Sequence, residues 1–367
     1  LMQNMNHDEP YIDKQSVREK ANSIRNNYIE SMEKHLINFD AKLIEKKFKV
    51  EWILSEEDLV SAIKKSLPSK SHNRVCFDIP EVPEKFFEKK NQIIEVSIDD
   101  NDNFSDLVVE ADFGIVENGS LVLLNKRSGK FFNSVPNIHI ILSINNLIEK
   151  TQDLETIVYL KYNSDFSEIK LPDDVRIIKS PFLQYESTDG FINPTEDVKP
   201  ANITVYLYDN GITEVMEDKK FRETLYCINC GRCKEVCPIY KIDPTYSPIE
   251  KLRNNIMFNY VDKEEIFRNT TLCGNCKEVC PVLIPFTELF IYQMQILRSQ
   301  HESRKANNLA RFFSKRSKMN KLNNRIRRYF FVNRYYRNNK KLMNYFLSQK
   351  DDFYNVYIMK QNEENNG

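Results

Sequence analysis

Seven of the eight cysteines lie between positions 227 and 280, in two closely spaced runs whose thiolates could bind iron. The first run reads Cys227-x2-Cys230-x2-Cys233-x3-Cys237-Pro238, and the second reads Cys273-x2-Cys276-x3-Cys280-Pro281. The C-x2-C-x2-C-x3-C-P spacing is typical of iron–sulfur proteins. Three close thiolates ligate one cluster, and the fourth ligates the neighbouring cluster in two-cluster ferredoxins.

This spacing predicts two clusters that exchange their last ligands. Cluster A would be bound by Cys227, Cys230, Cys233 and Cys280, and cluster B by Cys237, Cys273 and Cys276. A complete second motif would have its fourth cysteine at position 270, where this chain has Thr270. We therefore expect a [4Fe–4S] cluster at A and either a [4Fe–4S] or a [3Fe–4S] cluster at B.

Zinc and disulfides are the alternative uses of these thiols. A structural zinc site uses four ligands, commonly as two separated C-x2-C pairs, and the x2-x2-x3 spacing does not divide in that way. Disulfides are typical of secreted chains, and the N-terminus has no apolar core like that of a signal peptide. The eighth cysteine, Cys76, lies in an apolar stretch and is expected to be a buried, inert thiol.

The charge of the chain is zero overall but unevenly distributed. Residues 301–341 hold fourteen Lys and Arg against one acid, Glu302, so the remainder carries the compensating negative charge. Aromatic residues are interleaved with these cations. The simplest reading is a solvated helical tail. Among the functional readings, we favour docking of this basic aromatic tail to a partner protein or an anionic membrane surface over binding to nucleic acid.

No window approaches the 18 or more apolar residues of a membrane-spanning helix. Clustered thiols without a secretion signal indicate a reducing cytoplasm. We therefore expect a cytoplasmic protein, with peripheral contact at the inner membrane through the tail left open. No G-x-G-x-x-G fingerprint is present, so no bound flavin or NAD is expected.

Before the cysteine runs, sequence patterns of helices and strands alternate. Between and after the runs, the patterns are those of helices. An amphipathic helix is predicted over 13–38, a strand over 48–54, and a helix starting at Ser55 with Asp58 three residues on. Further strands are predicted over 75–79, 93–98, 113–116, 121–124, 138–144, 175–178 and 203–207, with a helix near Phe86 and mixed signals over 147–160. Helical periodicity returns at Ile249, Leu252 and Ile256 and again over 290–297.

These patterns predict four segments. They are an N-terminal helical segment with the first strand (1–54), an α/β domain (55–210), an all-α ferredoxin domain with two iron–sulfur clusters (211–300), and the basic helical tail (301–367).

Three stretches resemble the lactate-utilisation iron–sulfur proteins of the LutB type, in which a LUD domain precedes a helical ferredoxin domain. Residues 111–123 are similar to the LUD signature around A-E-T-G-T, and Val135-Pro136-Asn137-Ile138-His139 is similar to the following Pro-x-x-His strand. The junction around Tyr208-Asp209-Asn210-Gly211, the two cysteine runs and Ile284-Pro285 are also similar. A structural histidine is the favoured reading of His139, and a catalytic role is the alternative that the resemblance raises.

The resemblance implies a NagB/RpiA/CoA-transferase-like α/β fold for the LUD region. It also implies a non-catalytic electron-transfer subunit of a complex that oxidises L-lactate, or a related 2-hydroxy acid, to pyruvate. The implied partners are the other subunits of that complex, a cysteine-rich protein and a second LUD protein. The alternative is a redox-sensing or scaffold iron–sulfur protein with no substrate of its own; no catalytic residue is predicted under either reading.

Overall fold

The computed structural model describes most of the chain before the basic tail. The described ranges are 14–67, 75–79, 94–95, 104–132, 134–163, 172–181, 185–187, 190–191, 202–257 and 270–300. The predicted helix near Phe86 and the predicted basic helical tail lie outside them. The chain divides into two compact units: residues up to Glu217 together with Ile228–Cys230, and Asp218–Cys227 together with the chain from Gly231 onward.

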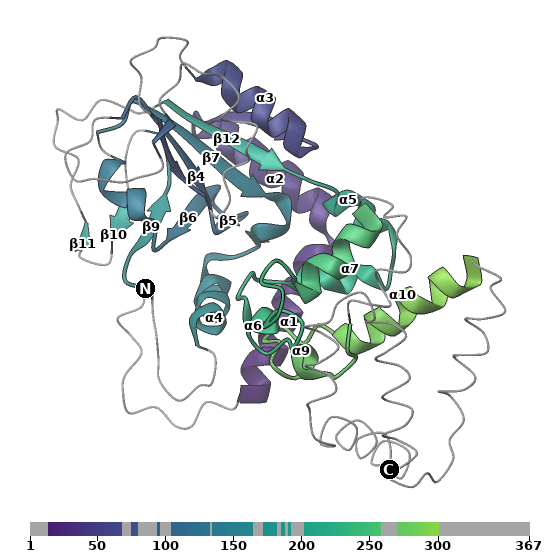
Figure 1. Ribbon diagram of the computed structural model, residues 1–367. Coiled ribbons are helices and arrows are strands. Elements are labelled where there is room, and N and C mark those ends of the chain that lie inside the picture. Colours follow the sequence, from purple (N-terminus) through teal and green to yellow (C-terminus); the bar gives the residue numbers. More distant parts are fainter. Residues whose placement is uncertain are drawn as a thin grey trace, which may run out of the picture. The chain divides into compact units, whose positions relative to one another are not determined.

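The first unit is built on a parallel sheet in the order β1-β12-β7-β4-β2-β3 (Figure 1). Its strands are β1 (Lys49–Ile53), β2 (Val75–Asp78), β3 (Ile94–Glu95), β4 (Asp106–Glu110), β7 (Asn137–Ser143) and β12 (Asn202–Tyr208). The central strands β4 and β7 are almost continuously buried, because a parallel sheet in an α/β protein is covered on both faces.

A second sheet has the order β11-β10-β9-β6-β5-β8 and is antiparallel except where β5 pairs with β8. Its strands are β5 (Phe113–Ile115), β6 (Ser120–Leu124), β8 (Leu147–Ile148), β9 (Val175–Ile178), β10 (Tyr185–Ser187) and β11 (Gly190–Phe191). A tight turn, which the dipeptide Asn118-Gly119 favours, joins β5 to β6, with Gly119 at a φ of 62°. A side chain rarely adopts this backbone conformation, which is why glycine suits the turn.

The helices of the first unit are α1 (Lys14–Glu30), α2 (Met32–Glu45), α3 (Glu56–Ser66), α4 (Thr151–Tyr162) and α5 (Ile212–Glu217), with 3-10 turns η3 (Arg127–Phe131) and η4 (Ile144–Asn146). The helix predicted over 13–38 is thus two helices that meet at Ser31. The predicted start of α3 is confirmed, because the Ser55 hydroxyl accepts a hydrogen bond from the Asp58 amide.

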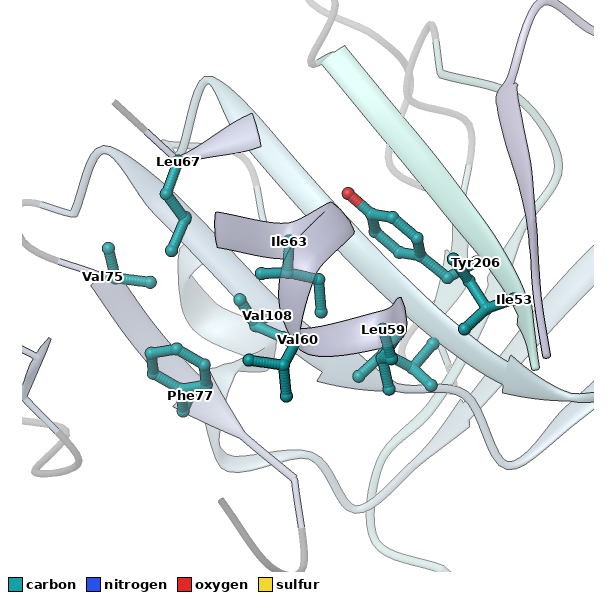
Figure 2. Packing of buried hydrophobic residues seen from close by; sticks show 10 residues of the cluster. Ile53, Leu59, Val60, Ile63, Leu67, Val75, Phe77, Val108 and Tyr206 are labelled. Atoms are coloured by element: carbon teal, nitrogen blue, oxygen red, sulfur yellow. The ribbon is translucent and has the colours of Figure 1, made fainter. Parts of the chain in front are cut away.

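Helix α3 covers one face of the parallel sheet. Leu59, Val60 and Ile63 of this helix pack on side chains from five strands (Figure 2). The strand residues in this cluster are Ile53, Val75, Phe77, Val108, Ile141 and Tyr206. Burial of these apolar side chains fixes the helix against the sheet.

The strand predicted over 48–54 is present. Its apolar residues alternate at Phe48, Val50, Trp52 and Leu54, but this pattern does not match the buried face. Trp52 is 48% exposed and Leu54 is 69% exposed, whereas Ile53 is 5% exposed. β1 lies at the edge of the sheet, and Ile53 faces α3. The strand β4 lies at the centre of the sheet, although the sequence analysis does not predict it.

The second unit is helical in its described part. It contains the 3-10 turn η5 (Phe221–Tyr226) and the helices α6 (Arg232–Glu235), α7 (Pro248–Met257), α9 (Asn275–Glu278) and α10 (Phe286–Gln300). Buried residues of α7 and α10 form its apolar interior, namely Ile249, Leu252, Phe286, Leu289 and Phe290. The fold class predicted from the sequence, an α/β domain followed by a helical domain, is confirmed.

Candidate metal centre

The two cysteine runs adopt the same local backbone. Each has a left-handed glycine before a four-residue helix: Gly231, with φ 76°, precedes α6, and Gly274, with φ 83°, precedes α9. Both helices end at a valine, Val236 or Val279, with φ −87° and ψ −6°. The repeated sequence G-x-C-K-E-V-C-P thus folds twice into one structure.

The repeat extends to the residues before each glycine. Asn229 and Leu272 are both left-handed, with φ values of 54° and 51°. Leucine is rarely left-handed, and such strain is typically kept where the backbone serves a function. By the same correspondence Thr270 takes the place of Cys227. Thr270 is buried, and its hydroxyl accepts a hydrogen bond from the Leu272 amide at 3.3 Å.

The last thiol of the first run lies near the second run. Burial raises the pKa of the Cys237 thiol, and the charge of Cys273 raises it further. Burial also raises the pKa of Cys276 to about 12, with contributions from Cys273 and Cys237. The charges of Cys237 and Cys273 thus act on Cys276 across the two runs.

Backbone amides point at these sulfurs. Cys237 Sγ accepts hydrogen bonds from the Ile239 and Tyr240 amides, and Cys280 Sγ accepts one from the Ile284 amide at 3.4 Å. Amide donors of this kind surround cluster-ligating cysteines and influence the potential of the bound cluster.

Cys227, Cys233, Cys237, Cys273, Cys276 and Cys280 belong to the second unit. Cys230 is grouped with the first unit, so its part in the site rests on the sequence spacing. Over the described residues, no three His, Cys, Asp or Glu side chains come close enough to hold one metal ion.

A buried cation lies beside the first run. The Arg253 side chain of α7 donates from Nη2 to the Thr224 carbonyl at 2.5 Å, and the Cys227 amide donates to the same carbonyl at 3.4 Å. Burial lowers the pKa of Arg253, whereas Cys227, Glu250 and Cys233 act in the opposite direction. No sequence pattern points to this arginine.

In the first unit, His139 lies inside the core. Its Nε2 is 3.1 Å from Asp106 Oδ1 and its Nδ1 is 3.2 Å from the Tyr206 hydroxyl, which in turn donates to Ser66 Oγ. His139 is 3% exposed and Asp106 is fully buried. These contacts give His139 a structural role, and Cys76 is likewise buried in β2.

The loop after β4 carries a compact charge cluster. Asp112 pairs with Lys161 at 2.7 Å and with Lys126 at 3.3 Å, and it accepts a hydrogen bond from the Leu124 amide. Burial acts to raise the pKa of Asp112, but the two ammonium groups and the hydrogen bonds outweigh it and hold the pKa below its usual value. Burial raises the pKa of the nearby Glu110.

Comparison with known proteins agrees with these observations. Residues 223–284, which include both cysteine runs, match the family model described as a 4Fe-4S dicluster domain. Together with the thiol arrangement, this match defines an iron–sulfur protein.

The more particular likeness is to lactate utilization proteins. The chain is 28% identical over 202 residues to the Lactate utilization protein B of Bacillus thuringiensis, covering 53% of this chain and 40% of that protein. It is 27% identical over 199 residues to the Lactate utilization protein B of Bacillus cytotoxicus, covering 52% and 39%. The resemblance to the LutB type is confirmed, and the chain spans about two fifths of the length of these relatives.

A crystal structure of a DUF162 family protein from Deinococcus radiodurans matches 48% of this chain and 98% of its own, at 12% identity and a TM-score of 0.32. A score this low does not establish a shared fold. Within the described residues, no helix is long and apolar enough to cross a membrane.

Proposed function

We propose that this chain is an electron-transfer component of a system that oxidises L-lactate, or a related 2-hydroxy acid, to pyruvate. The observation that carries the proposal is the repeated backbone at the two cysteine runs, inside the residues that match a dicluster domain. The similarity to the proteins named Lactate utilization protein B supports the substrate class.

Cluster A is assigned to Cys227, Cys230, Cys233 and Cys280, and cluster B to Cys237, Cys273 and Cys276. The proximity of Cys237 to Cys273 and Cys276 supports the exchange of ligands between the runs. Thr270 stands where a fourth thiolate of cluster B would be. Cluster B is then either a [4Fe–4S] cluster in which one iron lacks a protein thiolate, or a [3Fe–4S] cluster that lacks that iron.

The residues fit such groups. The buried thiols lack the water that would stabilise their charged forms, and backbone amides take its place at the sulfurs. When bound, iron–sulfur clusters carry single electrons. The chain's own part is to bury the sulfurs, to donate hydrogen bonds to them and to set the surrounding charge.

Oxidation of a 2-hydroxy acid releases two electrons, so a separate redox centre is needed to take them from the substrate. We assign that centre to partner subunits of the lactate-utilisation system, a cysteine-rich protein and a second LUD protein. The basic tail at 301–341, outside the described residues, is proposed to dock to such a partner or to the inner membrane.

Anaerobic purification of the full chain tests the proposal. We expect a brown protein with about seven to eight iron atoms per chain, inorganic sulfide, and electron paramagnetic resonance (EPR) signals from two clusters. Co-purified subunits should support lactate-dependent reduction of these clusters. A colourless protein holding zinc at the same thiols would overturn the redox assignment.

Thr270 favours one second candidate function, a redox-sensing or scaffold protein. An iron without a protein thiolate is more readily lost on oxidation, which is a property of sensors. The two functions differ under mild oxidant. A sensor loses iron and changes its binding partners, whereas an electron carrier cycles reversibly with its iron content unchanged.

A further inference from the structure

Arg253 is held at the turn that carries the first cysteine. Its Nη2 donates to the Thr224 carbonyl at 2.5 Å, and the Cys227 amide donates to the same oxygen at 3.4 Å. Thr224 belongs to η5, which packs against α7, and the Thr224 side chain is fully buried. The guanidinium is therefore fixed by the same backbone that positions Cys227.

One donor of this guanidinium has no partner in the protein. Arg253 Nε is buried, and none of the residues that the structure describes accepts a hydrogen bond from it. A buried N–H of a charged group is normally paired, because leaving it unpaired is unfavourable. The orphaned donor of Arg253 thus remains for an acceptor that is not among the described residues.

The surrounding negative charges identify where that acceptor lies. Cys227, Glu250 and Cys233 are the groups whose charges favour the protonated arginine. Glu250 is already paired with Lys234 at 3.1 Å near the surface. Cys227 and Cys233 of the first run are therefore the two thiols whose charges act on the buried guanidinium.

Among the described residues, no buried cation acts on the Cys276 thiol of the second run in the way that Arg253 faces the first run. The charges that act on Cys276 are those of Cys273 and Cys237, and the cation that acts on Cys237 is Lys241, which is exposed. Charges in water are screened far more than charges in a protein interior. The two runs thus share a backbone but differ in their electrostatic surroundings.

We propose that Arg253 is a positioning and tuning residue for the cluster bound by Cys227 and Cys233: its Nε donates to a sulfur there, and its charge raises the reduction potential. The inference rests on the proposed function, because it needs iron at these cysteines. Its physical basis is that reduction adds one negative charge, which a nearby fixed cation and an N–H donor both stabilise.

The test is an EPR-monitored redox titration of the anaerobic full-length protein. In Arg253→Gln, the signal that is lost in Cys227→Ala should titrate at a more negative potential. We expect the reduction equilibrium to change about tenfold, which is about 59 mV for one electron. Arg253→Lys keeps the charge but loses the Nε donor, so its shift should be smaller. Lys251→Gln on the same helix removes an equal charge and should leave the potential unchanged.

Each outcome bears on the inference. A wild-type protein without iron at these thiols would defeat the proposed function and this inference together. Two intact clusters in Arg253→Gln with an unchanged midpoint would overturn the inference alone. If Arg253→Gln fails to retain iron, the Arg253→Lys midpoint decides: a negative shift supports the role, and an unchanged value overturns it.

Discussion

The Cys237 thiol lies within electrostatic range of the Cys276 thiol, although the two belong to different cysteine runs. Burial raises the pKa of the Cys276 thiol to about 12, and the charges of Cys273 and Cys237 contribute to this rise. The proline after Cys237 ends its run, and the chain returns through α7 before the second run begins. The relationship supports a site in which each run supplies the last ligand of the other run's cluster.

The exchange of ligands predicts which cysteine variants resemble each other. Cys280→Ala should remove the same EPR signal as Cys227→Ala, although Cys280 belongs to the second run. Cys237→Ala should resemble Cys273→Ala in the same way. Iron content and EPR spectra of the four anaerobic proteins are the measurements. Loss of the same EPR signal in the Cys280 and Cys273 variants would contradict the assignment.

Thr270 gives a gain-of-ligand prediction. Thr270→Cys restores the thiol that Cys227 supplies in the first run, so cluster B should become a fully thiolate-ligated [4Fe–4S] cluster. Any signal of a [3Fe–4S] cluster should disappear, and the iron content should reach about eight per chain. Thr271→Cys is the matched control, because it adds a thiol one residue away from the required position.

The left-handed glycines predict equal sensitivity in the two runs. Gly231→Ala and Gly274→Ala should each destabilise their loop by about 1–2 kcal/mol, because an L side chain is strained at these φ values. No crowding adds to this cost: a Cβ on Gly231 meets nothing within 4 Å, and one on Gly274 meets only Thr287 Oγ1 at 4.0 Å. The rate of iron loss to a chelator measures the effect. Asparagine at the same positions should be milder, and a harmless alanine would argue against the described backbone.

Asp112 gives a pH-dependent prediction for the first unit. Its pKa is depressed in the folded state, so its contribution to stability is present above the ordinary aspartate pKa of about 3.9 and is lost as the pH falls through the folded value. Asp112→Asn should lower the free energy of unfolding by about 2 kcal/mol at pH 7.

The difference between Asp112→Asn and the wild type should shrink as the pH falls below about 4. Urea unfolding followed by the fluorescence of Trp52, the single tryptophan, reports on the unit that contains Asp112. Glu45→Gln, a change at an exposed residue of α2, is the control. A pH-independent loss of stability in Asp112→Asn would show that its charge is not the cause.

The sequence predicted most reliably those features that a few neighbouring residues determine. The spacing of seven cysteines indicated iron–sulfur chemistry, Ser55 with Asp58 gave the start of α3, and Asn118-Gly119 gave the β5–β6 turn. Each depends on neighbouring residues alone, so the order of the chain contains the necessary information.

Packing between segments that are distant in the sequence was harder to predict. The strand β4 carries charged residues at both ends, and its central place between β7 and β2 follows from pairing with strands that are distant in sequence. The burial of Ile53 rather than Trp52 follows from the position of α3, which no alternation within β1 encodes.

The residues alone therefore determined which atoms could bind iron, and their spacing indicated how many clusters to expect. Only the tertiary structure brought Cys237 to Cys276 and Arg253 to Cys227, and only it enclosed His139 within a hydrogen-bonded core. The reason is physical: thiol spacing is a property of a few consecutive residues, whereas charge, burial and hydrogen bonding at a site depend on segments that meet only when the chain folds.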